Sequence, residues 1–378
     1  METKHKKEVS LMKDVFELMD QLGHEQVVFC RHPKTGLKAI IAIHDTTMGP
    51  ALGGCRMYPY ESTEDALEDV LRLSHGMTYK CGIADVDYGG GKMVIIGDPS
   101  MDKSPELFRA VGRFVGSLNG RFMTGTDMGT VPEDFIHALR ETDSINGLPE
   151  SYGGLGDTSI PTALGVFQGM KATAKFLWGT DQLAGRLIAI QGIGKVGSRL
   201  IQLLIEADAH CIIADIDPEK AHKIKEKYPE KIDVCEVNEI HRVDCDIFSP
   251  CAGGSVINDN TILELRCQAI VGSANNQLAH KRHGDQLFEL GILYAPDYLV
   301  NAGGLIQVAV EVEGGKQKER VIAKTQAIYE MLLQIYERSK RDRIPTYLAA
   351  DYIVQERIRT VADIRRMTLG KDSERKRR

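Results

Sequence analysis

Residues 187–197 read LIAIQGIGKVG, a short apolar run that leads into three glycines in the pattern G-x-G-x-x-G. The run has the length of a buried strand, and the glycines open the helix that follows. In such a strand–turn–helix unit the first glycine permits a tight turn, the second lets a pyrophosphate approach the backbone, and the third lets strand and helix pack closely. The helix N-terminus then faces the phosphates. The stretch predicts a dinucleotide-binding α/β domain.

The candidate cofactor contacts of this loop are Gly192, Ile193, Gly194, Lys195, Val196 and Gly197. Asp215 ends the next apolar run, with Ile216 beside it, and a carboxylate there would bind a ribose 2′-hydroxyl and repel a 2′-phosphate. No basic residue follows until Lys220, so no base is expected beside this carboxylate. We therefore expect NAD rather than NADP as the cofactor. A glycine-rich turn without a ligand is the alternative.

Short apolar runs alternate with helical segments in the chain from about residue 149, at residues 187–190, 211–214, 246–249 and 269–272. None shows the apolar–polar alternation of a half-exposed strand, which indicates strands that are buried on both faces. The pattern predicts a parallel sheet covered by helices on both sides. A helix closed by Gly179 precedes this sheet, and one long helix is expected over about residues 317–340.

The N-terminal part of the chain mixes strands with helices. The runs 27–31 and 38–45 are rich in β-branched residues and are bounded by turn residues, as strands are. Helices are expected to begin after Ser62, with a capping box, and after Ser104, with proline at the first helical position. Residues 121–125 are expected to form another strand.

The length and composition of the chain limit the possible classes of protein. At 378 residues it exceeds the roughly 250–300 over which one core usually extends, so two domains are expected. A net charge of −6 gives no reason to expect nucleic acid or an anionic membrane as partner. The chain shows no signal peptide or apolar membrane span, so a cytoplasmic protein is expected. The eight cysteines lack metal-binding spacings, which indicates reduced thiols and no metal.

Residues 87–96, DYGGGKMVII, place Lys92 directly after three glycines. A phosphate-binding loop would also need an earlier glycine and a Ser or Thr after the lysine, and the chain has neither. A second lysine, Lys80, ends the helical segment GMTYK and is expected to enter a turn, and Asp127 ends a strand. One lysine can hold a carboxylate, while the other, desolvated beside a second cation, can act as a base. The glycines are expected to keep side chains away from Lys92; a solvated surface charge is the alternative.

Six motifs resemble those of the leucine/phenylalanine/valine dehydrogenase family over about residues 20–365: GPALGGCRM (49–57), GMTYK (76–80), GGGK (89–92), TGTDMGT (124–130), GSANNQL (272–278) and APDYLVNAGG (295–304). The resemblance implies a two-domain α/β fold with an inter-domain cleft, assembled as a homo-oligomer. Residues 1–148, completed by about 340–378, would form the substrate-binding, catalytic and oligomerisation domain. Residues 149–339 would form the NAD-binding Rossmann domain.

The reaction that the resemblance implies is the NAD-dependent, reversible oxidative deamination of an L-amino acid to a 2-oxo acid and ammonia. Lys80 would hold the substrate carboxylate, Lys92 would be the general base that activates water, and Asp127 would exchange a proton with the amino group. The other substrate contacts implied are Gly53, Gly125, Asn146, Asn276 and Leu305. The other cofactor contacts implied are Arg56, Thr162, Cys251, Ala252, Ala274, Asn276 and Asn301.

Within the family the resemblance is greatest to the phenylalanine-specific members, which implies oxidation of L-phenylalanine to phenylpyruvate. Leucine-preferring relatives carry Ala in place of Gly125 and Val in place of Leu305, and Asn146 matches an aromatic-type pocket position. A leucine, valine or broad-specificity enzyme, with tryptophan among its substrates, is the alternative. Val131 and Val310 depart from the family pattern and bear on specificity or loop packing.

Two other functional classes fit the residues less well. A nucleotide-sensing protein without catalysis would be expected to lack Lys92 or Asp127, and both are present. A hydroxy-acid dehydrogenase would need a histidine–carboxylate pair. Its nearest candidate, His75 beside the GMTYK motif, is interpreted as a surface residue at a helix end.

Overall fold

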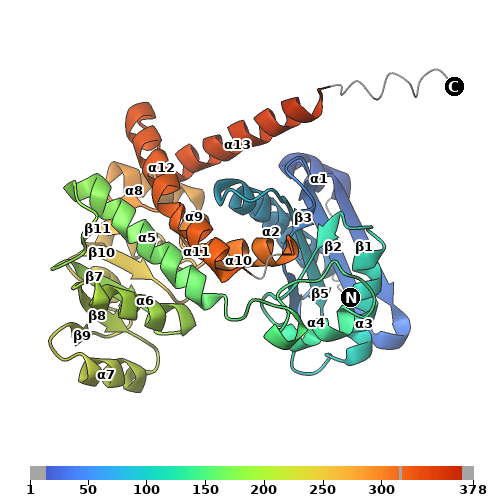
Figure 1. The fold of residues 1–378 in the computed structure, drawn as a ribbon, viewed down its shortest axis with the longest axis horizontal. Coiled ribbons are helices and arrows are strands. Elements are labelled where there is room, and N and C mark those ends of the chain that lie inside the picture. The colour runs from blue at the N-terminus through green and yellow to red at the C-terminus, as the bar shows by residue number, and fades with distance from the viewer. Residues whose placement is uncertain (1–13, 315–316, 368–378) are drawn as a thin grey trace, which may run out of the picture. The chain divides into compact units, whose positions relative to one another are not determined.

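The computed structural model describes residues 14–314 and 317–367, which divide into two compact units. The first unit comprises the described residues up to Thr78 together with Tyr88–Leu148. The second comprises Tyr79–Asp87 and the described remainder of the chain. Each unit has its own six-stranded sheet with helices packed on it (Figure 1). The expected fold class, a two-domain α/β protein, is confirmed.

The N-terminal part of the chain contains five helices counting one 3-10 turn, and six strands, within the residues described. In chain order they are α1 Val15–Leu22, β1 Gln26–His32, η1 Pro33–Thr35, β2 Leu37–Asp45, β3 Ala51–Leu52, β4 Cys55–Tyr58, α2 Thr63–Ile83, β5 Gly89–Ile96, α3 Pro105–Gly116, β6 Phe122–Met123 and α4 Pro132–Ala138. The expected strands at 27–31 and 38–45 are therefore confirmed as β1 and β2.

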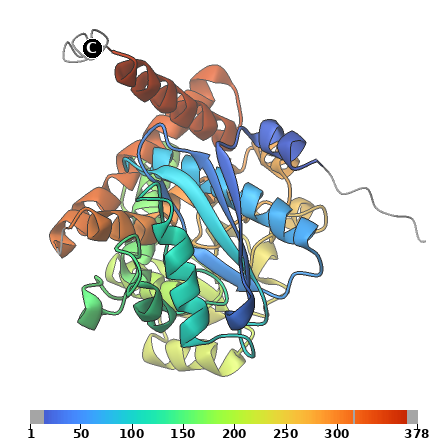
Figure 2. The same cartoon turned by 90° about the vertical axis from the view of Figure 1, so that its right-hand side faces the viewer.

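The sheet of the first unit has the strand order β1-β2-β5-β3-β6, with β4 paired to β5. Strand β2 is antiparallel to β1 and β5, whereas β3 and β4 run parallel to β5. Successive strand residues point to opposite faces. Ile41 and Ile43 therefore pack with α3, while Ile40 and Ala42 pack with α1 and α2. Figure 2 looks onto this sheet, with α3 over the nearer face.

The helices of the first unit begin where their caps are expected. Before α2, the Ser62 hydroxyl accepts the Asp65 amide at 3.0 Å and donates to the Asp65 carboxylate at 2.7 Å. The Ser104 hydroxyl caps α3 by accepting the Leu107 amide at 3.1 Å. Because α2 is 21 residues long, residues 76–80 lie inside the helix and not in a turn after it. The strand expected over 121–125 is shorter, since β6 has two residues.

The three glycines before Lys92 are strand residues of β5. A Cβ at Gly89 would lie 2.0 Å from a carbonyl oxygen of β2, and one at Gly90 would lie 2.1 Å from a hydroxyl of α2. A Cβ at Gly91 would lie 2.7 Å from an aromatic ring of β6. Protein atoms thus fill the space that side chains would take. The expectation that these glycines keep the approach to Lys92 clear is wrong; they let β5 pack closely against its neighbours.

The rest of the chain begins at Pro149 and contains the second sheet. Its elements are η2 Glu150–Tyr152, α5 Ser159–Trp178, β7 Leu187–Gln191, α6 Lys195–Glu206, β8 His210–Ala214, α7 Pro218–Lys227, β9 Ile232–Val234, η3 Ile240–Arg242, β10 Cys245–Pro250, η4 Ile262–Glu264, β11 Cys267–Ile270, α8 Lys281–Glu289, β12 Leu293–Tyr294, α9 Asp297–Val300, α10 Gly303–Val312, α11 Lys318–Gln326, α12 Ile328–Asp342 and α13 Thr346–Arg365. The four expected strands are β7, β8, β10 and β11, of which β11 begins two residues early.

The second sheet has the strand order β12-β11-β10-β7-β8-β9, and all of its pairs are parallel. Counted from β7 as the first strand, this is the 6-5-4-1-2-3 order of the doubly wound dinucleotide-binding fold. The consecutive residues Ile188, Ala189 and Ile190 are all fully buried, so both faces of the sheet are covered. The order reverses between β7 and β10, and ligands bind such folds at the carboxyl ends of the strands flanking this point.

The long helix expected over 317–340 is two helices, α11 and α12, which meet at Ala327. The Thr325 hydroxyl donates to the Val321 carbonyl at 2.7 Å, and a side-chain bond to the residue four positions earlier tends to bend a helix. The single-helix expectation is therefore wrong. Apolar spacing alone did not show the bend.

The C-terminal helix α13 packs on Tyr79–Asp87. Arg357 of α13 pairs with two aspartates of that segment, at 2.6 and 2.9 Å. The expectation that residues from about 340 complete the N-terminal domain stays a prediction, and its portion at 368–378 lies outside the described residues.

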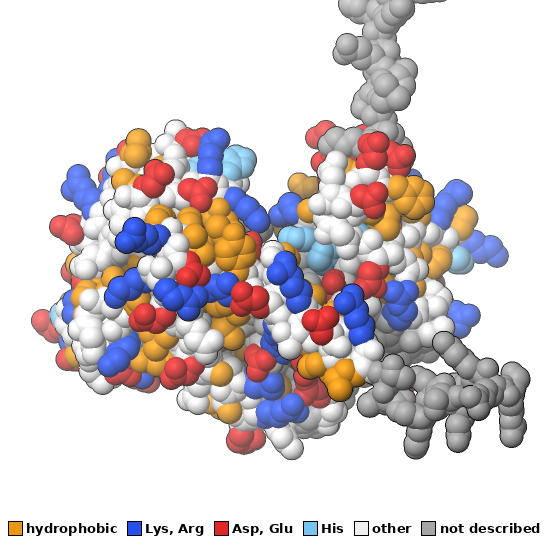
Figure 3. Space-filling model, turned by 90° about the horizontal axis from the view of Figure 1, so that it is seen from above, with side chains coloured by type: hydrophobic (Ala, Val, Ile, Leu, Met, Phe, Trp, Pro, Cys, Tyr) orange, Lys and Arg blue, Asp and Glu red, His pale blue; other side chains and the backbone are white. Residues whose placement is uncertain are grey.

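The remaining features of the fold are its cysteines, the hydropathy of its helices and its surface charges. All eight cysteines are free, and six of them are buried. Within residues 14–314 and 317–367, no helix is both long enough and apolar enough to cross a membrane. On the face shown in Figure 3, acidic and basic side chains are interspersed.

Candidate active site

Lys92 lies on a central strand of the first sheet, with its side chain on the face that α2 covers. Its cross-strand partner on β2 is Ala42, and both Ala42 and Val94 pack on that face. Arg56 stands opposite Val94 on β4 and therefore points to the same face. Lys92 is only 4% exposed, so a charged amine there needs a partner inside the protein.

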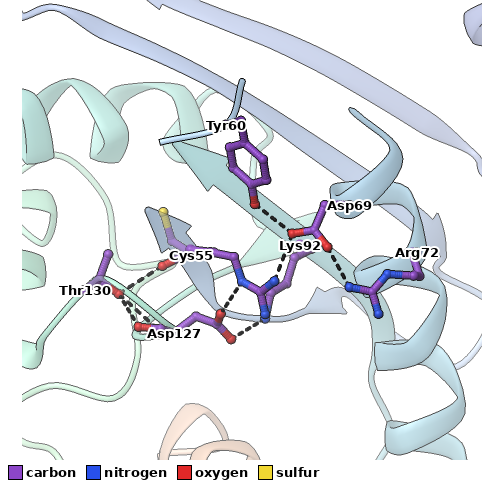
Figure 4. A network of polar contacts seen from close by, with 8 residues as sticks. Cys55, Tyr60, Asp69, Arg72, Lys92, Asp127 and Thr130 are labelled. Atoms are coloured by element: carbon purple, nitrogen blue, oxygen red, sulfur yellow. Dashed lines mark hydrogen bonds and ion pairs between the residues drawn. The ribbon is translucent and has the colours of Figure 1, made fainter. Parts of the chain in front are cut away.

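Asp127 supplies that partner from the loop after β6. The Lys92 Nζ donates to Asp127 Oδ2 at 2.6 Å, and the Arg56 Nε donates to Oδ1 at 3.0 Å. Thr130 fixes the loop, because its hydroxyl accepts the Asp127 amide and donates to the Cys55 carbonyl, each at 2.9 Å. Each carboxylate oxygen is thus bound by a different cation (Figure 4).

The neighbours of this carboxylate decide its ionisation. Burial raises the pKa of Asp127, but the charges and hydrogen bonds of Lys92 and Arg56 outweigh burial and lower the pKa to about 2. Asp127 is therefore ionised at neutral pH and can accept a proton. As a neutral amine, Lys92 can keep one N–H on Asp127 and turn its lone pair to a water molecule.

Arg56 has a second carboxylate partner, Asp69, on α2. The Arg56 Nη1 donates to Asp69 Oδ2 at 2.9 Å, and the same oxygen accepts the Tyr60 hydroxyl at 2.7 Å. Arg72 donates to the other oxygen of Asp69 at 2.6 Å. Charges therefore alternate from Asp69 through Arg56 to the buried pair (Figure 4). The sequence motifs imply a cofactor contact for Arg56 and do not reveal this chain of contacts.

The implied substrate residues Gly125 and Asn146 are packed together. A Cβ at Gly125 would lie 2.4 Å from both the backbone oxygen and the side-chain oxygen of Asn146. Asn146 is 5% exposed, and its Nδ2 has no hydrogen-bond partner among the described residues. A buried donor of this kind is left for a bound molecule or water to satisfy. Gly53 also marks a close approach, since a Cβ there would lie 1.8 Å from the Gly91 carbonyl oxygen.

Lys80 lies in the part of α2 that groups with the second unit, where it is joined to Asn301. The Lys80 Nζ donates to Asn301 Oδ1 at 2.7 Å. The Asn301 amide in turn donates to Asn275 Oδ1 at 2.8 Å and to the Ser273 carbonyl at 3.2 Å. Burial raises the pKa of the neighbouring Asp297 carboxyl, and a backbone amide and the Lys80 charge counteract it. An implied substrate residue and an implied cofactor residue thus share a hydrogen bond.

The three glycines of the loop after β7 have three different surroundings. Gly192 has a φ of +97°, in the left-handed region, and a Cβ there would lie 2.7 Å from that of Ala252. A Cβ at Gly197 would lie 2.1 Å from the Gly192 carbonyl oxygen, so α6 packs closely on the loop. A Cβ at Gly194 would meet nothing within 4 Å. The loop therefore combines a tight turn, a close helix contact and an open backbone.

The start of α6 is open to an anion. Gly194 is its N-cap and offers no side-chain hydrogen bond, and Lys195 and Val196 open its first turn. The first amide N–H groups of a helix have no partner within the helix, and the helix dipole favours negative charge there. These residues fit a pyrophosphate.

Asp215 follows β8 and binds the glycine loop directly. Its Oδ2 accepts the Ile193 amide at 2.6 Å, and its Oδ1 accepts the Asp217 amide at 2.9 Å. Burial raises the pKa of Asp215, but these amides and the Lys220 charge outweigh burial and lower it. The Lys220 Nζ lies 4.0 Å from the carboxylate, so the expectation that no base stands beside Asp215 is wrong. Ile216 is 90% exposed.

Four implied residues follow β10 and β11, the next two strands of the sheet on one side of β7. Cys251 and Ala252 follow β10 on the far side of the point where strand order reverses, and the Cys251 amide donates to the last residue of β7 at 2.7 Å. Ala274 and Asn276 follow β11, and Asn276 has a φ of +51°. All four therefore lie at the carboxyl end of the sheet, as the glycine loop does.

Two implied residues lie in the first turns of α5 and α10, which pack on each other. Thr162 is in α5, and Leu305 is half-buried in α10. A Cβ at Gly304 would lie 3.3 Å from the Thr162 hydroxyl. Of the two departures from the family pattern, Val310 is buried in α10, and Val131 is 46% exposed before α4.

Two family models match the chain. Residues 24–144 match the Glu/Leu/Phe/Val dehydrogenase dimerisation domain, and residues 153–365 match the Glutamate/Leucine/Phenylalanine/Valine dehydrogenase model. The chain belongs to this dehydrogenase family. It is therefore an amino acid dehydrogenase, an oxidoreductase that acts on a CH–NH2 group.

Relatives within the family match nearly the whole dehydrogenase chain. The phenylalanine dehydrogenase of Thermoactinomyces intermedius is 69% identical over 95% of this chain and 98% of its own length. The leucine dehydrogenase of Bacillus cereus is 49% identical over 93% of this chain and 95% of its own. The crystal structure of L-tryptophan dehydrogenase from Nostoc punctiforme is 44% identical, with a TM-score of 0.83 over 92% of this chain and 99% of that one. The resemblance of the sequence motifs is confirmed.

The dehydrogenase motifs did not lead to every polar residue of these sites. Tyr60 and Asp69 lie outside the six motifs, and nothing in their local sequence indicates a contact with Arg56. Asn275 lies inside GSANNQL, where it could have been found. His75 is half-buried, with its ring 4.8 Å from that of His44, so its interpretation as a surface residue at a helix end is wrong.

Proposed function

We propose that this dehydrogenase catalyses the NAD-dependent, reversible oxidative deamination of L-phenylalanine to phenylpyruvate and ammonia. The observation that carries the proposal is the Lys92–Asp127 pair, a buried amine bound to an ionised carboxylate. The choice of phenylalanine is supported by phenylalanine dehydrogenases that are 57–69% identical over at least 90% of this chain.

The second unit supports NAD as the cofactor. The loop from Gly192 to Gly197 and the first turn of α6 would hold the pyrophosphate, and Asp215 would bind the ribose. The other residues that would border the cofactor are Arg56, Thr162, Ile216, Cys251, Ala252, Ala274, Asn276 and Asn301. When bound, NAD accepts a hydride from the substrate Cα. Equal efficiency of the wild type with NADP would contradict the role of Asp215.

Three charged side chains would act in the reaction. Lys80 would bind its carboxylate, and Asp127 would take a proton from its amino group. Loss of hydride from Cα then leaves a cationic iminium carbon. Lys92, as a neutral amine, would take a proton from water while the water oxygen forms a bond to that carbon.

The same groups would complete the reaction. Asp127 would return its proton to the nitrogen, and the C–N bond would break as ammonia leaves. The hydroxyl on Cα then loses its proton, after Lys92 has released the first proton to solvent, and becomes the carbonyl of the 2-oxo acid. Run backwards, these steps give reductive amination.

The pocket residues support an aromatic substrate. Gly125, Asn146 and Leu305 would shape the space for the side chain, with Gly53 and Asn276 near the reacting end. The unpartnered Asn146 Nδ2 can donate weakly to the face of an aromatic ring. A leucine, valine or broad-specificity dehydrogenase is the alternative, supported by the 49% identity to leucine dehydrogenase and the likeness to tryptophan dehydrogenase.

A screen of NADH formation with each L-amino acid tests this proposal. We expect the greatest kcat/KM with L-phenylalanine, by about tenfold over leucine, since a pocket contact of ~1–3 kcal/mol sets the preference. A greater kcat/KM with an aliphatic amino acid would overturn the substrate. No NADH formation with any amino acid would overturn the reaction itself.

We also propose that the enzyme is a cytoplasmic homo-oligomer. The match of residues 24–144 to a dimerisation domain supports the assembly. Among the described strands β1 pairs with β2 alone, and Phe29 on this edge is 51% exposed. Sedimentation of the purified protein would measure the number of subunits, and a monomer at all concentrations would contradict the proposal.

A further inference from the structure

The Lys92–Asp127 pair is connected to three side chains, Arg56, Asp69 and Tyr60, for which the sequence motifs imply no part in the proton chemistry. We infer that Arg56, Asp69 and Tyr60 are positioning residues for the reaction, an inference that rests on the function proposed above. Arg56 holds Asp127 against Lys92. Asp69 and Tyr60 hold Arg56 in turn, and the charge of Asp69 balances that of Arg56.

The two bonds of Arg56 come from different nitrogens. Nε donates to Asp127 and Nη1 donates to Asp69, at 3.0 and 2.9 Å. A guanidinium presents its N–H groups in a rigid plane, so binding at one end fixes the direction of the other. The Arg56 side chain is 18% exposed, and solvent screens these contacts little. Through Arg56, the position of Asp69 on α2 therefore fixes the position of the Asp127 carboxylate.

Three donors hold the Asp69 carboxylate. One oxygen accepts Arg56 and the Tyr60 hydroxyl, and the other accepts Arg72. Burial raises the pKa of Asp69, but these donors outweigh burial and lower it. Asp69 is thus an ionised group in a fixed position, and Tyr60 adds a hydrogen bond without a charge.

This arrangement matters because each Asp127 oxygen has its own cation. Without Arg56, Oδ1 would lose its partner and the carboxylate could turn away from Lys92. Without Asp69, Arg56 would carry an unbalanced positive charge beside the pair. The two losses change the local charge in opposite directions, although both would disturb the geometry.

Other titratable groups also face the pair. Cys55 stays neutral, because burial raises the pKa of its thiol. Asp134 on α4 is bound to Lys103 at 2.7 Å. Arg72 is joined to the pair through Asp69. Among the described residues, Arg56 on β4, Tyr60 after it and Asp69 on α2 also face the pair.

The test is the pH dependence of kcat/KM for L-phenylalanine in matched variants. On the acid limb the rate rises with pH as the base loses its proton, and the coupled pair titrates as one unit. Arg56→Gln removes a positive charge, so the limb should move to higher pH by about one unit. Asp69→Asn removes a negative charge, so the limb should move to lower pH, by less because Asp69 is farther away.

Two further variants separate charge from position. Tyr60→Phe keeps every charge, so kcat should fall while the limb stays in place. Arg56→Lys keeps the positive charge but cannot bridge two carboxylates with two nitrogens. The acid limb of its pH profile should therefore lie closer to that of the wild type than the limb of Arg56→Gln does, while its kcat stays low. Glu141→Gln is the matched control, since Glu141 is an arginine-bound carboxylate with a 14% exposed side chain, against 16% for Asp69.

Opposite shifts for Arg56→Gln and Asp69→Asn, with no shift for Glu141→Gln, would establish the inference. Shifts in the same direction, or lower activity with an unmoved limb in both variants, would overturn it. In either case circular dichroism must show that the variants are folded; if Arg56→Gln does not fold, Arg56→Lys and Asp69→Asn decide the matter.

A second measurement needs no turnover and so distinguishes this inference from the proposed function. Acetic anhydride reacts with an amine only in its neutral form, and mass spectrometry of the peptide containing Lys92 gives the pH at which this lysine is half-reactive. The midpoint should rise in Arg56→Gln and fall in Asp69→Asn. If the midpoints move in this way but no amino acid is oxidised, the proposed function fails and the charge coupling stands. Unchanged midpoints would overturn the coupling, whatever the substrate.

Discussion

In the first unit the groups placed for chemistry are side chains, whereas in the second unit the groups placed for a ligand are mostly backbone. Lys92 and Arg56 approach Asp127 to within 2.6 and 3.0 Å, and the balance of their charges sets the ionisation of the carboxylate. In the loop from Gly192 to Gly197, the space comes from absent side chains. The carboxylate of Asp215 holds the backbone of that loop.

This difference predicts which substitutions each site tolerates. A centre made of paired charges loses its chemistry when one partner is removed, because the remaining charge is left buried without compensation. A loop made of glycines is sensitive to a single methyl group where a ligand or the chain needs the room. Substitutions in the two regions should therefore fail in different assays.

The largest expected effect is on turnover, in Lys92→Ala. If Lys92 is the general base, kcat should fall by ~10²–10⁴ or more, because positioned proton transfer contributes about that much. Lys103→Ala is the matched control, since it breaks a 2.7 Å lysine–aspartate pair in the same unit and should leave most of the activity. Steady-state kinetics with L-phenylalanine would measure both. Near-normal turnover of Lys92→Ala would remove Lys92 from the mechanism.

The next largest effect is on the stability of the first unit, which should depend on pH through His24. His24 is buried and its Nε2 lies 2.8 Å from the Ser74 hydroxyl; burial and the nearby His44 lower its pKa to about 4. Unfolded histidine titrates near 6.5, so the stabilising contribution is complete above about pH 6.5 and is lost as pH falls toward 4. We expect a loss of about 2 kcal/mol between pH 7 and pH 5 from this group.

Denaturant unfolding at pH 7 and pH 5 measures that loss. His24→Gln should flatten the dependence, whereas His222→Gln, at an exposed position, should leave it as in the wild type. A variant of His24 with the full pH dependence would show that another group is responsible.

A smaller effect, about tenfold, is expected on cofactor affinity in Gly194→Ala. The added methyl group meets nothing within 4 Å, so the fold should be unchanged, and weaker binding would report a ligand in that space. Gly253→Ala is the control, because its added methyl group is equally unobstructed. Calorimetric titration with NADH measures both variants. Unchanged affinity in Gly194→Ala would place the pyrophosphate elsewhere.

The smallest effect concerns substrate choice, in Gly125→Ala. The new Cβ would lie 2.4 Å from two oxygens of Asn146, one of them in the backbone, so Asn146 must shift. We expect the ratio of kcat/KM for phenylalanine over leucine to fall about fivefold, which corresponds to ~1 kcal/mol. An unchanged or increased ratio would show that this contact does not shape the pocket.

The parts of the fold that could be predicted from the sequence are those with local causes. The glycines 192, 194 and 197 act on a strand and a helix adjacent to them in the chain, and the Ser62 and Ser104 caps act within three residues. The strands β7, β8 and β10 are short and mostly buried apolar runs, so their existence could be predicted without knowledge of their partners. For these elements, pattern and structure agree.

The parts that could not be predicted depend on contacts between distant residues. The glycines before Lys92 were interpreted as leaving open space beside the lysine. The sequence does not show that side chains of α2 and β6 fill this space. The Lys80–Asn301 bond joins residues 221 positions apart. Asp69 is one of several acidic residues on α2, and only its position opposite β4 brings it to Arg56.

Proton chemistry and dinucleotide binding belong to separately built sites in this account. Calorimetric titration of NADH into folded Lys92→Ala tests this separation most directly. If the two sites share no binding partner, the loss of Lys92 should change the free energy of NADH binding by about 0.5 kcal/mol or less, so the Kd for NADH should stay within about twofold of the wild-type value while turnover is lost. A Kd weakened about tenfold or more in the folded variant would contradict the claim and place Lys92 in the cofactor site.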